Sequence, residues 1–215
     1  MAASTGLKIV VKGVQTHGSQ PWSGVDPIVV ASQIVLGLQT IASRQVNVAY
    51  LPSVITVGQI HGGNRGNIIP DSVWMDGTIR TFDTAMRDDI LLRITRTATD
   101  IARSAGAEAE VSFGLGGTVL ENDTSLTTRM LPTLRRAAGA ENVSFINPIM
   151  GAEDFQFFAE NAPGMFFFLG VTPKGWEPAK APANHSPYFY ADEDALEVGV
   201  RAMAQLAVDY LKGGR

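Results

Sequence analysis

The sequence predicts an α/β protein in which a ferredoxin-like βαββαβ domain is followed by part of a mainly parallel α/β domain. In residues 6–114, alternating apolar segments and segments of helical periodicity follow the order strand, helix, strand, strand, helix, strand. Residues 119–215 show a different pattern, with helical segments around one continuous apolar run. The glycine-rich stretch at residues 114–117 separates the two patterns, and we place the domain boundary there.

The first strand and the first helix are joined by a loop that contains a histidine. Apolar residues alternate around Ile9 and Val11, which predicts a strand at Leu7–Lys12. Asp26 and Pro27 provide an N-cap and a proline at the first helical position. The helix that follows has apolar residues at spacings of three and four and on its other faces too, so we expect it to be buried or to lie at a subunit contact.

The rest of the ferredoxin-like pattern consists of a strand pair, a helix and a final strand. Strands are predicted at Ser53–Ile60 and Val73–Phe82, with a glycine-rich connection between them. Asp83 or Thr84 caps the second helix, which stops at a glycine. Glu108–Phe113 completes a predicted antiparallel sheet that has both helices on one face.

The second half contains few strands. We predict a helix at Ser125–Ala138, a short strand at Val143–Phe145, a short helix at Glu153–Asn161 and a long helix from Leu196. The apolar run Met165–Val171 is typical of a strand buried on both faces of a parallel sheet. Two strands cannot form a doubly covered sheet, so we expect the remainder of this domain to lie outside the sequence.

Composition narrows the class of protein. A net charge of −4 gives no electrostatic attraction for nucleic acid or for an anionic membrane. There is no cysteine, which excludes disulfides and thiolate metal sites. No apolar run reaches the roughly 20 residues of a membrane span, and the N-terminus lacks a signal pattern, so we expect a cytoplasmic protein.

Four loops carry residues that can do chemistry, and each also has a structural explanation. His17 lies in an exposed turn within GVQTHGSQPWSGVDP, where it could equally be a solvated surface histidine. Asn67 lies in HGGNRGNIIP, which could be an ordinary hairpin connection. Glu153 and its neighbouring aspartate in MGAEDF could simply cap a helix. His185 in NHSPYFY could be a structural histidine in a turn.

Taken together in this order, the four motifs resemble the M20 family of metallopeptidases and amidohydrolases. They are GVQTHGSQPWSGVDPIVVASQIVLGLQTI, GGNRGNIIPDSVWMDGTIRTF, MGAEDF and NHSPYF. The likeness is to the branch of aminoacylases and hippurate hydrolases, which includes the auxin-conjugate hydrolases. The resemblance implies a catalytic α/β domain with one or two divalent metal ions, zinc or manganese, and a ferredoxin-like lid that forms a homodimer contact.

The resemblance also assigns parts of the architecture to this chain. Residues 6–114 are similar to the lid, and residues 119–215 are similar to the C-terminal part of the catalytic domain. The N-terminal part, which supplies most metal ligands and the glutamate base, has no counterpart here. The implied reaction is metal-assisted hydrolysis of the amide bond of an N-acyl amino acid or a similar small conjugate.

Individual positions match functional positions of the family. The resemblance makes His185 a metal ligand, and His17 the lid histidine that stabilises the oxyanion in the partner subunit. Asn67 and Arg80 match lid positions that hold the substrate's terminal carboxylate, and a guanidinium suits that role.

The loop MGAEDF is assigned to substrate binding less specifically. Gly151 and Glu153 match the loop beside the metal site, without a defined role for Glu153.

A non-catalytic protein is the alternative. A free-standing ferredoxin-like domain with an apolar helix could serve as a dimerisation module or bind a small molecule. Such a module has no use for MGAEDF or NHSPYF, so residues 119–215 favour the hydrolase. His61 belongs to neither hypothesis and is predicted to lie on the surface. We expect the chain, taken alone, to form lid-mediated dimers with negligible hydrolysis and weak metal binding.

Overall fold

The computed structural model describes residues 1–213, which form two compact units. The first unit comprises Met1–Leu120 together with Pro148–Phe157, and the second comprises Glu121–Asn147 and the chain from Phe158 onward. The domain limits expected from the sequence, 6–114 and 119–215, stay a prediction.

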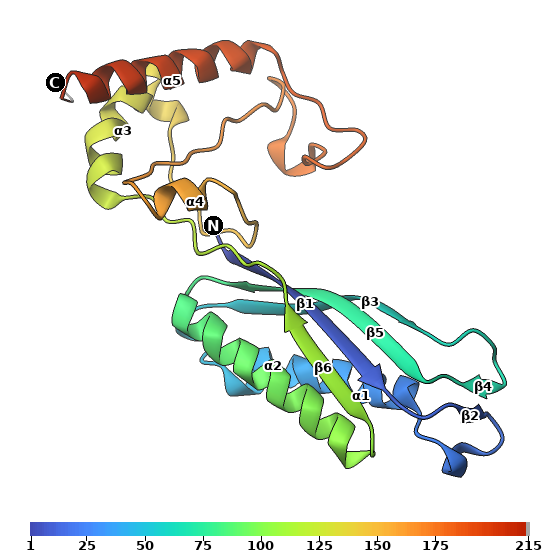
Figure 1. The fold of residues 1–215 in the computed structure, drawn as a ribbon. Coiled ribbons are helices and arrows are strands. Elements are labelled where there is room, and N and C mark those ends of the chain that lie inside the picture. Colours follow the sequence, from blue (N-terminus) through green and yellow to red (C-terminus); the bar gives the residue numbers. More distant parts are fainter. Residues whose placement is uncertain (214–215) are drawn as a thin grey trace. The chain divides into compact units, whose positions relative to one another are not determined.

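The first unit contains an antiparallel four-stranded sheet in the order β3-β5-β1-β6. Its elements along the chain are β1 (Ala3–Lys12), α1 (Pro27–Thr40), β3 (Ser53–Gly62), β5 (Ser72–Thr81), α2 (Thr84–Ser104) and β6 (Glu108–Phe113). Both helices cover the same face of the sheet (Figure 1). The predicted ferredoxin-like arrangement is confirmed, and β1 begins earlier than the alternation suggested.

Local signals define both helices. Asp26 Oδ1 accepts a hydrogen bond from Ile28 N at 2.9 Å at the start of α1. Asp83 Oδ1 accepts one from Met86 N at 2.6 Å at the start of α2. At the C-terminal end of α2, Gly106 has φ 75° and its neighbour Ala107 donates to the carbonyl of Ala102 at 2.9 Å, which is a Schellman motif. The last residues of α1 continue into a π-helical turn, Ile41–Gln45.

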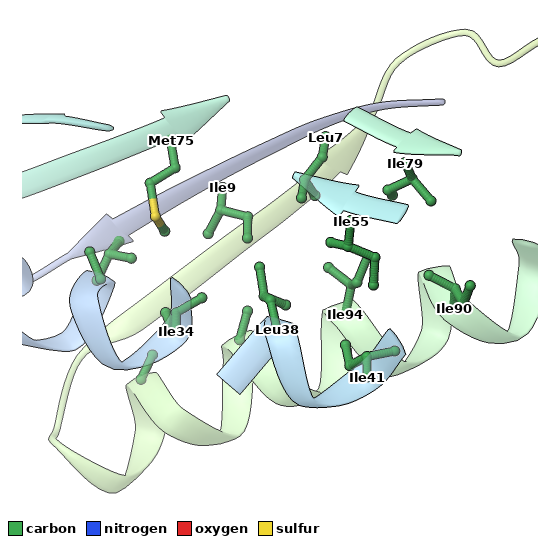
Figure 2. Packing of buried hydrophobic residues seen from close by; sticks show 14 of the residues in the cluster. Leu7, Ile9, Ile34, Leu38, Ile41, Ile55, Met75, Ile79, Ile90 and Ile94 are labelled. Carbon is green, nitrogen blue, oxygen red and sulfur yellow. The ribbon is translucent and has the colours of Figure 1, made fainter. Parts of the chain in front are cut away.

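Aliphatic side chains fill the space between the sheet and the helices (Figure 2). Each of them is almost completely removed from water, which contributes roughly 1.5–3 kcal/mol for a Leu, Ile or Met side chain. The labelled members are Leu7, Ile9, Ile34, Leu38, Ile41, Ile55, Met75, Ile79, Ile90 and Ile94. Because this core uses one face of the sheet, the opposite face remains available for other contacts.

Two short strands extend from one end of the sheet (Figure 1). They are β2 (Thr16–His17) and β4 (Ile68–Ile69), which pair antiparallel with His17 opposite Ile68. A 3₁₀ turn, Pro21–Ser23, follows β2. The short ladder therefore joins the loop that carries His17 to the connection between β3 and β5.

The second unit is helical. Its helices are α3 (Thr124–Ala138) and α5 (Asp194–Leu211), with 3₁₀ turns at Ala140–Asn142 and Pro178–Lys180. An ion pair between Arg136 and Asp209 and a small apolar cluster hold α3 and α5 together. The short helix α4 (Gln156–Ala159) begins in the first unit and ends in the second, and it occupies less of the chain than the expected Glu153–Asn161. In the part of the chain that the structure describes, no helix has the length and apolar character needed to cross a membrane.

Two predicted strands of the second half, Val143–Phe145 and Met165–Val171, are wrong. Neither segment is a strand, and within residues 1–213 the strands all belong to the first unit. An apolar run indicates burial, but a strand also needs neighbouring strands that satisfy its backbone groups. At Phe166 the side-chain amide of Asn122 provides this pairing, because it accepts from Phe166 N and donates to Phe166 O, both at 2.8 Å.

Candidate functional site

His17 is held at the tip of a closed loop on the first unit. Val14 and Val25 exchange two backbone hydrogen bonds of 2.9 and 3.0 Å across the base of this loop. Gln20 N donates to the carbonyl of His17 at 2.8 Å, and the β2–β4 pairing secures the other side. The His17 side chain itself is exposed, as the sequence predicted. A rigid loop thus presents an accessible imidazole.

The Nδ1 atom of His17 faces Ser19. The backbone N–H of Ser19 donates to Nδ1 over 3.1 Å, and the Ser19 hydroxyl lies 2.8 Å from the same atom. The other ring nitrogen, Nε2, forms no hydrogen bond with the residues that the structure describes. The imidazole is therefore oriented by its own loop, and Nε2 is available to a ligand.

Asn67 lies beside His17. Its carbonyl oxygen accepts a hydrogen bond of 2.8 Å from Gly18 N, and the following residue, Ile68, is the β4 partner of His17. The Asn67 side chain is exposed. The structure therefore brings His17 and Asn67 together at the tip formed by β2 and β4.

Arg80 lies near the end of β5, opposite Ser4 of β1 and Val54 of β3. Its neighbour Ile79 points into the core, so the Arg80 side chain lies on the face of the sheet that the helices leave uncovered. The Nη1 atom of Arg80 is buried and has no hydrogen-bond partner among the described residues. A buried guanidinium nitrogen without a hydrogen-bond partner destabilises the fold unless a ligand accepts a hydrogen bond from it.

The MGAEDF loop lies at the same end of the sheet as Arg80. Ala2, which precedes β1, donates from its backbone to the carbonyls of Ile149 at 3.1 Å and Gly151 at 3.0 Å. Gly151 is exposed and Glu153 is partly exposed. Gly151 therefore contacts the backbone two residues before Ser4, the β1 partner of Arg80, and Glu153 follows Gly151 in the same loop.

The predicted residues of the first unit form two separate groups. From Ser4, the partner of Arg80, to Lys12, the last residue of β1, the strand advances by about 26 Å at roughly 3.3 Å per residue. His17 and Asn67 lie beyond Lys12, at the end that β2 and β4 mark in Figure 1. The two groups of one chain therefore cannot both contact the same small substrate.

His185 belongs to the second unit. It is exposed, lies in a turn closed by a 3.1 Å hydrogen bond from Ser186 N to Ala183 O, and has φ 71°. A positive φ is uncommon for a residue other than glycine, and histidine is one of the residues that adopt it more readily than most. Within residues 1–213 no three histidine, aspartate or glutamate side chains come together as metal ligands. His185 is therefore not part of a three-ligand cluster among the described residues.

Three contacts in the first unit were not predicted from the sequence. Ser19 is a common loop residue, and only its geometry shows that it contacts His17. Gln156 follows MGAEDF and is buried against Gly117. No local sequence pattern predicts this contact. His61 is exposed as predicted, but it also stacks on Trp74 with ring centroids 4.2 Å apart. Alternation along β5 could have placed Trp74 on the uncovered face.

Gly24 closes the His17 loop, and we expect Gly24→Ala to open it. A Cβ atom at this position would overlap the carbonyl oxygen of Val14 and approach Thr16 Cγ2 to 2.7 Å. We expect the free energy of unfolding to fall by about 1–3 kcal/mol, the usual cost of overpacking. Denaturant unfolding measures this change. Gly66→Ala is the matched control because nothing lies within 4 Å of the added atom, and an equal loss in both variants would contradict the expectation.

Residues 3–105 match a known protein family, the M20 peptidase dimerisation domain. This match agrees with the resemblance that the sequence motifs indicate. Over 211 residues the chain is 36% identical to thermostable carboxypeptidase 2 of Saccharolobus solfataricus, covering 98% of this chain and 52% of the relative. It is 35% identical to N-acetyl-L-cysteine deacetylase of Bacillus subtilis, covering 91% of this chain and 45% of the relative.

A solved structure supports the same likeness. The chain superposes on the Bacillus subtilis YXEP protein, described as a dinuclear metal-binding peptidase from the M20 family, with a TM-score of 0.68 and 30% identity. The match covers 99% of this chain and 51% of that protein. This chain therefore spans about half the length of the relatives that it matches.

Proposed function

Because residues 3–105 belong to the M20 peptidase dimerisation family, we propose that the chain is the lid and the C-terminal part of a metal-dependent amidohydrolase. Its substrate would be an N-acyl amino acid or a similar small conjugate. Two relatives support this class of reaction by their names, one as a carboxypeptidase and the other as a deacetylase of an N-acetyl amino acid. Both substrate types pair an amide bond with a free carboxylate.

The observation that carries the proposal is the buried, unpartnered Nη1 of Arg80. A planar guanidinium binds a carboxylate through two parallel hydrogen bonds, and such a ligand would satisfy this nitrogen. Gly151 and Glu153 lie at the same end of the sheet and would line the substrate there. The Glu153 carboxylate would repel a substrate carboxylate, so Arg80 is the residue that binds it.

In this proposal the catalytic site needs two subunits. Arg80 of one subunit holds the substrate, and His17 with Asn67 reaches it from the other subunit, because about 26 Å of β1 separates the two groups within a chain. The exposed Nε2 of His17 would donate a hydrogen bond to the oxyanion of the tetrahedral intermediate. Asn67 can contact the substrate carboxylate bound by Arg80 only across the same subunit boundary.

His185 would contribute one ligand to a divalent metal ion, zinc or manganese, with a second metal ion in the complete site. An imidazole can bind either of these metal ions, but a zinc site needs three or four protein ligands. The remaining ligands would come from another part of the complete enzyme, since residues 1–213 contain no group of three candidate ligands. A bound metal ion would supply an activated water molecule at neutral pH.

The homodimer contact is proposed at the surface formed by α1 and the edge strand β3, called here the α1–β3 surface. One side of α1 packs on the sheet, while Val29 and Leu36 on the other side are 53% and 71% exposed. The β3 edge is unpaired and carries Ile60, which is 49% exposed. The opposite edge, β6, instead carries Glu108 and Glu110, which discourage edge-to-edge pairing. A second copy of the chain is the partner that the family description suggests.

Leu36→Asp tests this contact, and we expect it to convert dimers into monomers. A buried, unpaired carboxylate in an apolar interface costs several kcal/mol. This cost exceeds the free energy by which most dimers are favoured over monomers at micromolar concentration. Sedimentation equilibrium measures the mass. Leu92→Asp is the matched control, because Leu92 is 73% exposed on α2 and lies outside the α1–β3 surface. A dimer that persists in Leu36→Asp would contradict the proposed contact.

Hydrolysis of paired substrates tests the activity. A metal-loaded enzyme that contains this chain together with the missing catalytic part is expected to hydrolyse N-acetyl amino acids. Their C-terminal carboxamides should react with a kcat/KM about 10- to 100-fold lower, since they lose the charge on the group that Arg80 holds. No turnover of N-acetyl amino acids, or equal rates for acid and carboxamide, would refute the proposed function.

A further inference from the structure

The hydrogen bonds at His17 determine which ring nitrogen can carry the proton. The backbone N–H of Ser19 can only donate, and it points at Nδ1 from 3.1 Å. Nδ1 must therefore act as the acceptor, which leaves the proton of the neutral ring on Nε2. The Ser19 hydroxyl, 2.8 Å from Nδ1, can donate to the same lone pair region.

We propose that Ser19 is a positioning residue for His17. Its N–H and hydroxyl hold Nδ1 as an acceptor, and they thereby present Nε2–H to the substrate as a hydrogen-bond donor. This inference rests on the proposed function, because it specifies how His17 would be prepared to stabilise an oxyanion. Nothing else in the loop offers this control, since no other described residue forms a hydrogen bond with the His17 ring.

The same two contacts restrict the orientation of the ring. A half-turn of the imidazole about its Cβ–Cγ bond would place a carbon atom against the two Ser19 donors, and both hydrogen bonds would be lost. The donors lie only two residues from His17, in a loop closed by the Val14–Val25 pair. The ring is thus oriented before any substrate arrives, which is how a preorganised donor acts in catalysis.

The tautomer can be measured on this chain without any activity. The experiment is a two-bond ¹H–¹⁵N correlation spectrum of protein labelled with ¹⁵N-histidine, at a pH at which the rings are neutral, with the His17 signals identified by their loss in His17→Asn. We expect an unprotonated Nδ1 and a protonated Nε2. Ser19→Ala keeps the backbone N–H donor and loses only the hydroxyl, so the population of the tautomer with an unprotonated Nδ1 should fall but stay the larger one, and Ser19→Thr should restore the wild-type signals.

Ser23→Ala is the matched control. Ser23 lies in the same loop, and its hydroxyl forms no hydrogen bond with the residues that the structure describes. We expect its His17 signals to match those of the wild-type chain. A protonated Nδ1 in the wild-type chain, or His17 signals that do not change in Ser19→Ala, would overturn the inference.

Kinetics of the metal-loaded enzyme provide the second readout. Ser19→Ala removes one of two hydrogen bonds to Nδ1, so we expect kcat to fall about 3- to 10-fold with KM nearly unchanged. Ser19→Thr should recover most of kcat. An unchanged kcat in Ser19→Ala would overturn the positioning role. If instead His17→Ala itself retains full kcat while the spectra show the expected tautomer, the proposed function fails and the structural part of the inference stands.

Discussion

Replacing His17 by alanine is expected to lower kcat of the metal-loaded enzyme by about 10²- to 10³-fold, the usual cost of removing one oxyanion donor. KM should change little, because the Nε2–H group would meet negative charge that develops only in the transition state. Steady-state kinetics with an N-acetyl amino acid measures both constants.

His61→Ala is the matched control for this substitution. His61 is also an exposed histidine of the first unit, but its ring stacks on Trp74. We expect its kcat to stay within about twofold of the wild-type value, since it contacts no reacting group. A rise in KM alone for His17→Ala would mean that His17 binds the ground state and does not stabilise an oxyanion.

Replacing Arg80 by alanine is expected to lower kcat/KM by about 30-fold or more, because a buried charge pair with the substrate carboxylate is worth at least 2 kcal/mol. Arg80→Lys should recover only part of this loss, since an ammonium group cannot form two parallel hydrogen bonds. Initial rates below KM measure the effect. Arg103→Ala on α2 is the matched control, because Arg103 is exposed and its side chain pairs with Asp100 on the same helix.

Stability separates a binding role of Arg80 from a structural one. The Nη1 atom has no protein partner to lose in the described part of the chain. We therefore expect the free energy of unfolding of Arg80→Ala to fall by no more than about 1 kcal/mol. A much larger loss, matched in size by the loss of activity, would make Arg80 a structural residue of the sheet.

The ferredoxin-like fold could be predicted because its signals are local. Alternation marks β1, and single aspartates, Asp26 and Asp83, mark where each helix begins. The antiparallel pairs then follow from the order of the elements. The prediction of a strand at Met165–Val171 was wrong because strand formation depends on neighbouring strands. A local sequence pattern carries no information about those neighbours.

The candidate site could be predicted only as a set of residues. Motifs indicated His17, Asn67 and Arg80, but nothing in their spacing shows that the first two share one end of the sheet and the third lies at the other. The two-residue strands β2 and β4, which create that grouping, are too short to produce a periodic signal. The contact between Ser19 and His17 likewise depends on the shape of the loop.

Complementation between two inactive variants tests the central claim most directly. His17→Ala and Arg80→Ala enzymes are mixed under conditions that allow subunits to exchange, and hydrolysis of an N-acetyl amino acid is followed. If His17 and Arg80 act from different subunits, each mixed dimer has one intact site, and activity should return to roughly a quarter of the wild-type value. If the mixture stays as inactive as its components although mixed dimers form, the two residues do not share a site across the dimer, and the proposed arrangement is wrong.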